Sequence, residues 1–314
     1  MTSVAERGEK RMIELNRMPT EQPNPESAQI DRMTVPEMIG LMNREDRKVA
    51  DAVEKEKDHI AEAVEKIYGQ LRLGGRLIYC GAGTSGRLGI LDAAECPPTF
   101  STDPEMVQGL IAGGPAAMFR AVEGAEDDAG QGAEDLKQIG FGAKDVLVGI
   151  AASGRTPYVL GAMQYAKAQG APVIGLSCSP GSEIDEAADI GIAPTPGPEV
   201  ITGSTRMKCG TAEKMILNML TTCTMIRMGK VYGNLMVDVQ ATNEKLTERC
   251  ISMIIQATGC DRQKAQKLLA ESGNHPGKAI VMELSGCTER EAAQALEEAG
   301  GQIYEAIRRC GEHE

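Results

Sequence analysis

The middle of the chain alternates short apolar runs with segments of helical spacing. The apolar runs are four or five residues long and lie at residues 77–80, 107–111, 146–150, 173–177 and 190–193. Between them, apolar residues recur at helical spacing near residues 87–94, 115–139, 157–169 and 183–188. Short, largely apolar strands that alternate with helices are typical of a parallel sheet covered by helices on both faces. The pattern therefore predicts an α/β fold with three layers.

Helices are also predicted before and after this region. Thr34-Val35-Pro36-Glu37 is a capping box with proline at the first helical position, so a helix begins there. A second, amphipathic helix follows and ends at Gly74-Gly75. Residues 203–229 form a long apolar helix, whose methionines we assign to the core or to a subunit interface. Residues 1 to about 33 lack a periodic apolar pattern, and we expect an extended or partly disordered arm there.

The C-terminal segment contains an internal repeat of helical character. Gly259-Cys260 recurs as Gly286-Cys287, and Gly273 recurs as Gly300, at one offset. Two copies of a helix-turn-helix unit would bury their apolar faces against each other, which favours packing or dimerisation over ligand binding. We therefore divide the chain into an N-terminal arm with helices, an α/β domain and a small all-helical domain, at residues 1–66, 67–230 and 231–314.

Composition limits the partners of the protein. A net charge of −12 and an isoelectric point near 5.0 argue against nucleic acid and against an anionic membrane. No apolar run approaches the roughly 20 residues that span a bilayer, and residues 1–25 are polar without a signal core, so we expect a cytoplasmic protein. The nine cysteines include no Cys-x-x-Cys pair, which indicates reduced core residues.

Histidine offers little for catalysis or metal binding. His59, His275 and His313 have no catalytic neighbour in the sequence, so we expect neither a zinc site nor a Ser-His-Asp triad. We expect no metal and no cofactor. Acid–base work then falls to carboxylates or lysine.

The turn after the first apolar run is a candidate anion site. Residues 81–86, Gly-Ala-Gly-Thr-Ser-Gly, lie between a strand pattern and a helix pattern. Such a turn directs backbone N–H groups and the positive end of a helix towards an anion, and Thr84 and Ser85 add hydroxyl donors. The Lys-Ser/Thr pair of a P-loop is absent, and the next strand does not end in the acid that a dinucleotide site requires. A phosphate-binding turn remains, with a tight turn that holds no ligand as the alternative.

Two further segments repeat this chemistry. Residues 151–157, Ala-Ala-Ser-Gly-Arg-Thr-Pro, follow the third apolar run and precede a helix. Because ligands in parallel sheets bind at the carboxyl ends of the strands, both turns can converge on one phosphate. Residues 202–208, Thr-Gly-Ser-Thr-Arg-Met-Lys, open the long helix with hydroxyls and two cations. For this segment a helix N-cap with solvated charges is an equal alternative.

The chain resembles the N-acetylmuramic acid 6-phosphate etherase family, within the sugar isomerase (SIS) superfamily. The resemblance runs from about Ile30 over nearly the whole chain, and its most specific parts are Gly-Ala-Gly-Thr-Ser-Gly-Arg and Glu-Cys-Pro-Pro-Thr at residues 81–87 and 95–99. Cys209 stands where we expect alanine. The resemblance implies a SIS-type sandwich, a homodimer and a sugar-phosphate ligand. It also implies substrate-binding roles for Gly83, Thr84, Ser85, Ser153, Gly154, Arg155, Thr156, Ser204, Thr205 and Lys208.

The same resemblance implies a lyase of amino-sugar catabolism and peptidoglycan recycling. The family's reaction removes the lactyl ether from C3 of the sugar with water, which gives N-acetylglucosamine 6-phosphate and D-lactate. By resemblance, Glu95 is the acid that protonates the lactate oxygen and later activates water, and Glu126 is the base at C2. We expect Glu95 at a helix end, where a carboxylate opposes the dipole, which favours a functional role. Glu126 lies among other acids and could belong to a solvated face.

Two alternatives remain at this point. The first is a non-catalytic phosphosugar-binding regulator, since the family resembles the glucokinase regulatory protein. The second is an aldose–ketose phosphosugar isomerase, which shares ring opening and proton abstraction at C2. A binding module needs the hydroxyl-rich turns but not two carboxylates at the sugar, so Glu95 together with Glu126 favours the etherase.

Overall fold

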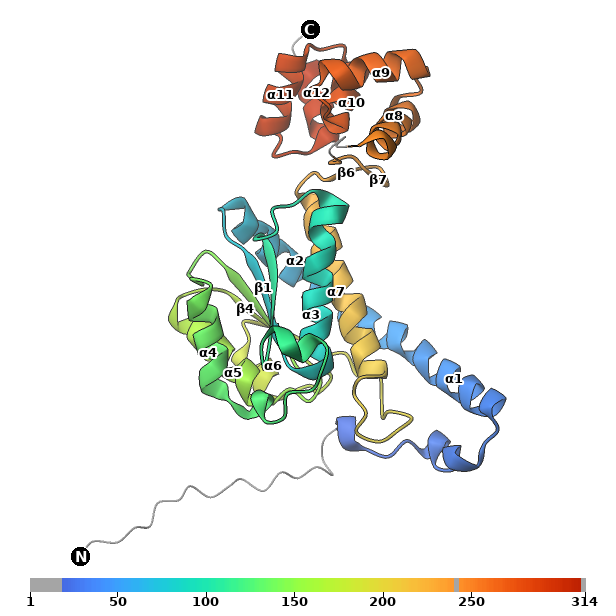
Figure 1. Cartoon of the computed structure of the whole chain (residues 1–314), viewed down its shortest axis with the longest axis vertical. Helices are drawn as coiled ribbons and strands as arrows, with labels where there is room; N and C mark the ends of the chain where they lie inside the picture. Colours follow the sequence, from blue (N-terminus) through green and yellow to red (C-terminus); the bar gives the residue numbers. More distant parts are fainter. Residues whose placement is uncertain (1–18, 240–242, 312–314) are drawn as a thin grey trace, which may run out of the picture.

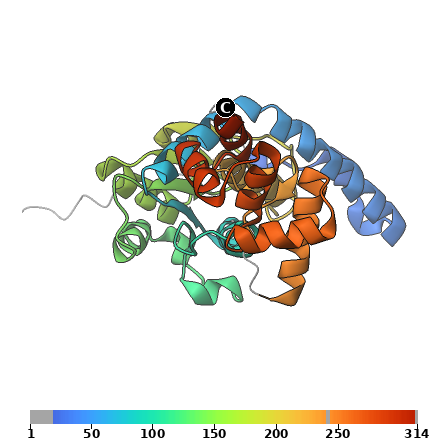
Figure 2. The same ribbon diagram turned by 90° about the horizontal axis from the view of Figure 1, so that it is seen from above.

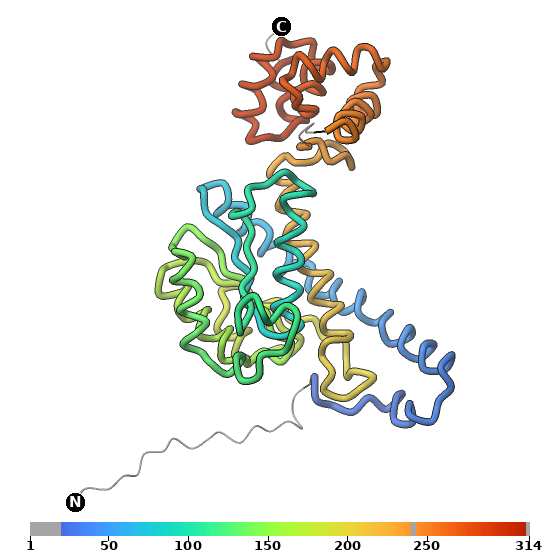
Figure 3. The backbone as a smooth tube through the Cα atoms, in the orientation of Figure 1, coloured from blue at the N-terminus to red at the C-terminus, as the bar shows by residue number. Residues whose placement is uncertain are grey.

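The computed structural model describes residues 19–239 and 243–311, which form an α/β body with a helical segment at each end (Figure 1). Helix α1 (Val35–Glu54) extends from one side of the body, and the C-terminal helices form a cluster beyond the end of α7 (Lys208–Arg227), as the backbone trace shows (Figure 3). No helix in the described part combines the length and hydropathy of a bilayer-spanning segment.

A five-stranded parallel sheet forms the centre of the body. Its strands are β1 (Leu77–Gly81), β2 (Val107–Ile111), β3 (Val146–Ile150), β4 (Val173–Leu176) and β5 (Ile190–Ile192). They pair in the order β2-β1-β3-β4-β5. The register aligns Gly81, at the end of β1, with Ile111 of β2 and Ile150 of β3. The loops after these three strands therefore begin at the same edge of the sheet.

Helices cover both faces of the sheet. Leu77 and Tyr79 of β1 belong to the apolar core under α2 (Lys57–Arg72), α3 (Gly83–Phe100) and α7. Ile78 and Cys80 belong to the core under α4 (Ala129–Gln138) and α5 (Pro157–Ala168), and α6 (Glu183–Ala187) packs on α5. Alternate residues of one strand thus face opposite layers. This arrangement confirms the predicted three-layer α/β fold.

A short hairpin and a helical cluster follow α7. The hairpin pairs β6 (Val231–Tyr232) with β7 (Leu235–Met236), and the helices are α8 (Glu244–Thr258), α9 (Arg262–Glu271), α10 (Pro276–Ser285), α11 (Glu289–Glu298) and α12 (Ile303–Gly311). Seen from above, this cluster overlies the body, and α1 projects beyond it (Figure 2). The predicted repeat is confirmed, because Gly259 and Gly286 both end a helix in the left-handed conformation, and the side chains of Asp261 and Thr288 then cap the next helix.

The predicted helix over residues 115–139 is wrong in its first half. The segment forms two 3-10 turns, η5 (Pro115–Met118) and η6 (Ala125–Asp127), before α4 begins. Gly114 and Gly124 precede these turns with φ of 69° and 74°, a conformation that ends a helical run and favours glycine. The break matters for function because η6 carries Glu126.

The helices beside the candidate site also differ from their predicted limits. α3 begins at Gly83 and continues past Pro97 and Pro98 to Phe100, rather than stopping near residue 94. The two prolines remove N–H donors from the last turn, but Cys96 and Phe100 hold this turn against the core. α7 begins at Lys208 rather than near residue 203.

Residues 19–32 correct the expectation of an extended arm. They form three 3-10 turns, η2 (Pro19–Glu21), η3 (Pro25–Ser27) and η4 (Ile30–Arg32). Asn24 is buried, and its Nδ2 donates to Glu45 Oε2 at 2.9 Å and to the carbonyl of Pro198 at 3.1 Å. Residues 1–18 of the predicted arm lie outside the described residues. Helix α2 runs across residue 66, and the division of the chain into domains stays a prediction.

Candidate active site

A pocket of about 360 Å³ lies where the loops after β1, β2 and β3 meet the segment before α7. Hydroxyl and glycine residues dominate its lining. The lining residues are Glu21, Ala82, Gly83, Thr84, Ser85, Glu126, Ala151, Ala152, Ser153, Thr156, Gly203, Ser204, Thr205 and Arg206. Most of the predicted binding residues therefore gather in one place.

The first turn brings a helix N-terminus to the pocket. Gly83, Thr84 and Ser85 are the first residues of α3, so their N–H groups precede the first intrahelical bonds. The turn is tight, because a Cβ on Gly81 would lie 2.7 Å from the N of Gly86, and a Cβ on Gly86 would lie 2.7 Å from the O of Gly81. Two glycines thus let strand and helix meet closely enough to aim these donors at an anion.

The second turn contributes Ser153 and Thr156. Thr156 is the residue before α5, whose first residue is Pro157. Gly154 is buried with φ of 71°, and a Cβ on it would lie 2.1 Å from Ser182 Oγ. Gly154 therefore packs beneath the turn, and neither it nor the half-buried Arg155 lines the pocket. Their predicted contact with substrate stays a prediction.

The third segment contributes Ser204, Thr205 and Arg206, but not Lys208. Lys208 is 1 % exposed, and its Nζ donates to Glu45 Oε2 at 2.7 Å and to the carbonyl of Pro196 at 3.0 Å. Burial opposes ionisation of Glu45, but hydrogen bonds from Lys208, Lys48 and Asn24 lower its pKa to about 2. Lys208 thus points into a buried ion pair, and we leave it out of the binding site proposed below.

The segment before α7 is held by a carboxylate from earlier in the chain. Glu199 is fully buried, and its two oxygens accept the N–H groups of Lys208 and Cys209, each at 3.0 Å. These are the first two residues of α7, so Glu199 caps the helix. The predicted N-cap at residues 202–208 is therefore replaced by a side chain that the sequence analysis did not single out.

The two predicted catalytic carboxylates lie in different places. Glu126 lines the pocket from η6 and is exposed. Glu95 is exposed on α3 and does not line the pocket. Ten residues separate it from Ser85 along one helix, a rise of about 15 Å. The expectation that Glu95 stands at a helix end is wrong, because α3 continues to Phe100.

Three residues of this site do not belong to the predicted binding set. Arg206 is an exposed cation that lines the pocket, and Glu21 of η2 also lines the pocket. Glu213 of α7 lies beneath the first turn, where its Oε1 lies at a hydrogen-bond distance of 2.8 Å from Ser85 Oγ. Burial raises the pKa of Glu213 to about 8, although the Ser85 hydrogen bond acts in the opposite direction. The position of Arg206 in Ser-Thr-Arg was a usable signal, but nothing in the local sequence marked Glu21 or Glu213.

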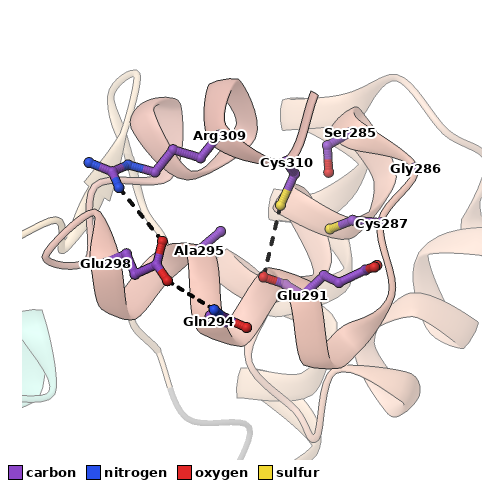
Figure 4. Close-up of a pocket in the computed structure, with 9 residues that line it drawn as sticks. All are labelled: Ser285, Gly286, Cys287, Glu291, Gln294, Ala295, Glu298, Arg309 and Cys310. Atoms are coloured by element: carbon purple, nitrogen blue, oxygen red, sulfur yellow. Dashed lines mark hydrogen bonds and ion pairs between the residues drawn. The ribbon is translucent and has the colours of Figure 1, made fainter. Parts of the chain in front are cut away.

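Another pocket, of about 280 Å³, lies between α10, α11 and α12 (Figure 4). Its polar side chains contact one another: Arg309 pairs with Glu298 at 3.7 Å, and Gln294 Nε2 donates to Glu298 Oε1 at 2.9 Å. It has no counterpart to the three hydroxyl-rich turns. The pocket at the strand ends is therefore the better candidate for binding an anion.

Comparison with known families identifies the class of protein. A family described as the SIS domain matches residues 139–223, and one described as the glucokinase regulatory protein N-terminal SIS domain matches residues 59–167. Together the matches run from α2 into α7 and include all five strands of the sheet. The α/β body is therefore a SIS domain.

Comparison with whole proteins identifies the family. The N-acetylmuramic acid 6-phosphate etherase of Photorhabdus laumondii is 62% identical over 272 residues, which cover 87% of this chain and 90% of that protein. The etherases of Klebsiella aerogenes and Clostridium botulinum are each 54% identical, over 94% of this chain and 98% of theirs. The chain belongs to the N-acetylmuramic acid 6-phosphate etherase family, as its motifs indicated.

Proposed function

We propose that this protein is a carbon–oxygen lyase that cleaves the D-lactyl ether of N-acetylmuramic acid 6-phosphate with water. The products are N-acetylglucosamine 6-phosphate and D-lactate, which places the protein in amino-sugar catabolism and peptidoglycan recycling. The observation that carries this proposal is the identity of 54% and 62% to proteins named for this activity, over most of both chains. The pocket at the strand ends supports it.

The phosphate binds among the three turns. N–H groups at the start of α3, together with the hydroxyls of Thr84, Ser85, Ser153 and Thr156, donate to its oxygens. Ser204 and Thr205 close the third side, and Arg206 supplies a positive charge for the phosphate or the lactyl carboxylate. The net charge of −12 makes such local donors necessary, because the protein as a whole repels anions.

The reaction is an elimination followed by hydration. Opening of the pyranose ring gives a C1 aldehyde, which acidifies the hydrogen on C2. Glu126 removes this proton, and Glu95 protonates the ether oxygen on C3 as D-lactate leaves. Water, activated by Glu95, then adds to C3 of the unsaturated aldehyde, and C2 regains a proton. The electron pair released at C2 thus expels the lactyl oxygen, and no redox partner is involved.

The chain acts as a homodimer in which each site uses both protomers. Glu95 stands about 15 Å along α3 from the phosphate turn, so a single chain does not bring it to the sugar. Glu95 of one protomer therefore completes the pocket of the other. An apolar groove of about 600 Å³ between α1, α2 and α7 gives a second copy a surface to bury, with Val53, Ile60, Val64, Met215, Met219 and Ile226 in its lining.

The protein works in the cytoplasm. All nine cysteines have free thiols, including buried ones that pack in the sheet and helices. Free thiols on this scale are typical of a reducing compartment. A phosphorylated sugar as substrate agrees with this location.

The test is release of D-lactate from N-acetylmuramic acid 6-phosphate. We expect Glu95→Gln and Glu126→Gln each to lower turnover by about 100-fold or more, since each removes a general acid or base. Asp127→Asn, which removes the adjacent carboxylate of η6, is the matched control and keeps turnover. Deuterium from solvent enters C2, and oxygen from solvent enters C3. Solvent oxygen in the lactate instead would show cleavage of the other carbon–oxygen bond and exclude the elimination.

A phosphosugar-binding regulator is the second candidate. Two observations favour it: the match to the glucokinase regulatory protein SIS family, and the position of Glu95 outside the pocket of its own chain. A regulator would bind N-acetylmuramic acid 6-phosphate and release no lactate. The same assay therefore separates the two functions.

A further inference from the structure

Ser85 is held by a buried acid that the reaction does not use. Ser85 lines the pocket at the first turn of α3, and its Oγ lies 2.8 Å from Oε1 of Glu213 on α7. Glu213 is 1 % exposed. A hydroxyl carries one proton, so a serine that donates to a carboxylate cannot also donate to a phosphate. The bound phosphate and an ionised Glu213 therefore compete for the same hydrogen.

The surroundings of Glu213 disfavour its ionised form. Among the described residues no cation forms an ion pair with it: Arg87 of α3 donates to the carbonyl of Met118, and Lys214 of α7 bonds to Asn218. The thiol of Cys178 lies close enough to Glu213 to interact with it electrostatically, and the thiol of Cys209 and the carboxylate of Glu199 in turn lie near Cys178. None of these groups supplies positive charge. Burial accordingly raises the pKa of Glu213 to about 8.

We propose that Glu213 is a positioning residue that, as a neutral carboxylic acid, donates to Ser85 Oγ and thereby directs the Ser85 hydroxyl proton to the substrate phosphate. This inference rests on the proposed function, because it requires a phosphate in the pocket of Ser85. When Glu213 loses its proton, Ser85 turns its hydrogen towards the carboxylate. The phosphate then loses one donor and meets a buried negative charge beneath the turn.

The sign of the pH effect follows from this geometry. The second ionisation of a phosphate ester has a pKa near 6, so above pH 7 the ligand keeps its charge while Glu213 titrates. Phosphate binding requires the acid form, so bound ligand raises the pKa of Glu213 and complex formation takes up a proton above pH 8. Affinity is then constant below pH 7 and falls as pH rises through 8.

The experiment measures the dissociation constant of N-acetylglucosamine 6-phosphate by calorimetry between pH 7 and pH 9. For the wild-type protein we expect the affinity to fall by about tenfold over this range, and we expect binding at pH 8.5 to take up protons. Glu213→Gln places an amide donor beside Ser85 at every pH. The affinity of this variant therefore falls by less than about twofold over the same pH range, and ligand binding takes up no proton. The KM for N-acetylmuramic acid 6-phosphate follows the same profile, while kcat does not.

Asp92→Asn is the matched control for a general effect of buried charge. Asp92 is a second buried carboxyl between α3 and α7, but it bonds to Tyr79 and Thr221 and does not line the pocket. We expect the Asp92→Asn protein to show the same tenfold fall in affinity between pH 7 and pH 9 as the wild type. Equal flattening by Asp92→Asn and Glu213→Gln would overturn the role of the Ser85 contact. A wild-type protein that takes up no proton at pH 8.5 would also overturn it, whether or not Glu213→Gln folds.

Lactate release measured in parallel separates this inference from the proposed function. An unchanged pH profile in Glu213→Gln, with normal lactate release by the wild type, contradicts the role of Glu213 alone. Tight, pH-dependent binding without lactate release contradicts the etherase activity and supports the role of Glu213. A wild-type protein that binds no sugar phosphate contradicts both.

Discussion

At the scale of single residues, Lys208 illustrates how burial changes the role of a charge. In the sequence it ends a run of hydroxyls and cations that resembles an anion site. In the structure its ammonium binds Glu45, which lies 163 positions earlier on α1. Local sequence cannot reveal a partner at that separation. Lys208 therefore joins α1 to the start of α7, and its predicted contact with substrate stays a prediction.

Lys208→Ala tests this structural role. The substitution leaves Glu45 buried without its partner, and we expect the free energy of unfolding to fall by about 3–5 kcal/mol in urea denaturation. Lys48→Ala is the control, since Lys48 bonds the same carboxylate from a side chain that is 57% exposed. It costs less than about 1 kcal/mol. Equal losses in the two variants would contradict the importance of the buried pair.

Some residues of the site can be predicted from the sequence immediately around them, and others cannot. Thr84, Ser85 and Ser153 lie in glycine-rich turns directly after predicted strands, so their place at the pocket follows from the sequence. Glu213 occupies the buried face of α7 between apolar residues, and glutamate in such a pattern is ordinarily expected on the surface. Its contact with Ser85 spans 128 positions and emerges only when α3 and α7 pack together.

At the scale of elements, the strands and the limits of α5 and α6 were predictable, whereas the end of α3 and the start of α7 were not. Each strand of the sheet begins and ends within one residue of its predicted run, because a short apolar segment is buried on both faces. Helix ends depend on tertiary contacts instead. α3 continues through two prolines because Cys96 and Phe100 are buried, and α7 starts where Glu199 caps it.

Glu199→Ala tests the cap on α7. The substitution leaves two backbone N–H groups without their acceptors, so we expect a loss of about 2 kcal/mol of unfolding free energy and a raised KM as Ser204 to Arg206 shift. Glu199→Gln keeps one carbonyl oxygen as acceptor, so we expect it to lose about half as much unfolding free energy as Glu199→Ala. A Glu199→Ala protein with wild-type stability and KM would show that the cap neither stabilises α7 nor positions the third segment of the pocket.

At the scale of the whole molecule, the strand order and the relation between distant helices decide where function lies. The sequence predicts that loops after parallel strands share one edge, but not the order β2-β1-β3-β4-β5. It predicts a helix between the phosphate turn and Glu95, but it does not show that Glu95 lies outside the pocket that Glu126 lines. That separation emerges only in the folded chain. The mechanism therefore depends on whether Glu95 of a second protomer completes the pocket.

Mixing two inactive variants tests whether sites are shared. In the proposed homodimer, Glu95→Gln and Glu126→Gln proteins that are unfolded together in equal amounts and refolded would form mixed dimers in half of the molecules. If Glu95 of one protomer serves the pocket of the other, each mixed dimer has one intact site, and the mixture regains roughly a quarter of wild-type lactate release. Refolding either variant alone is the control and restores nothing. If both glutamates act within one chain, every site of a mixed dimer lacks one carboxylate, and the mixture stays inactive.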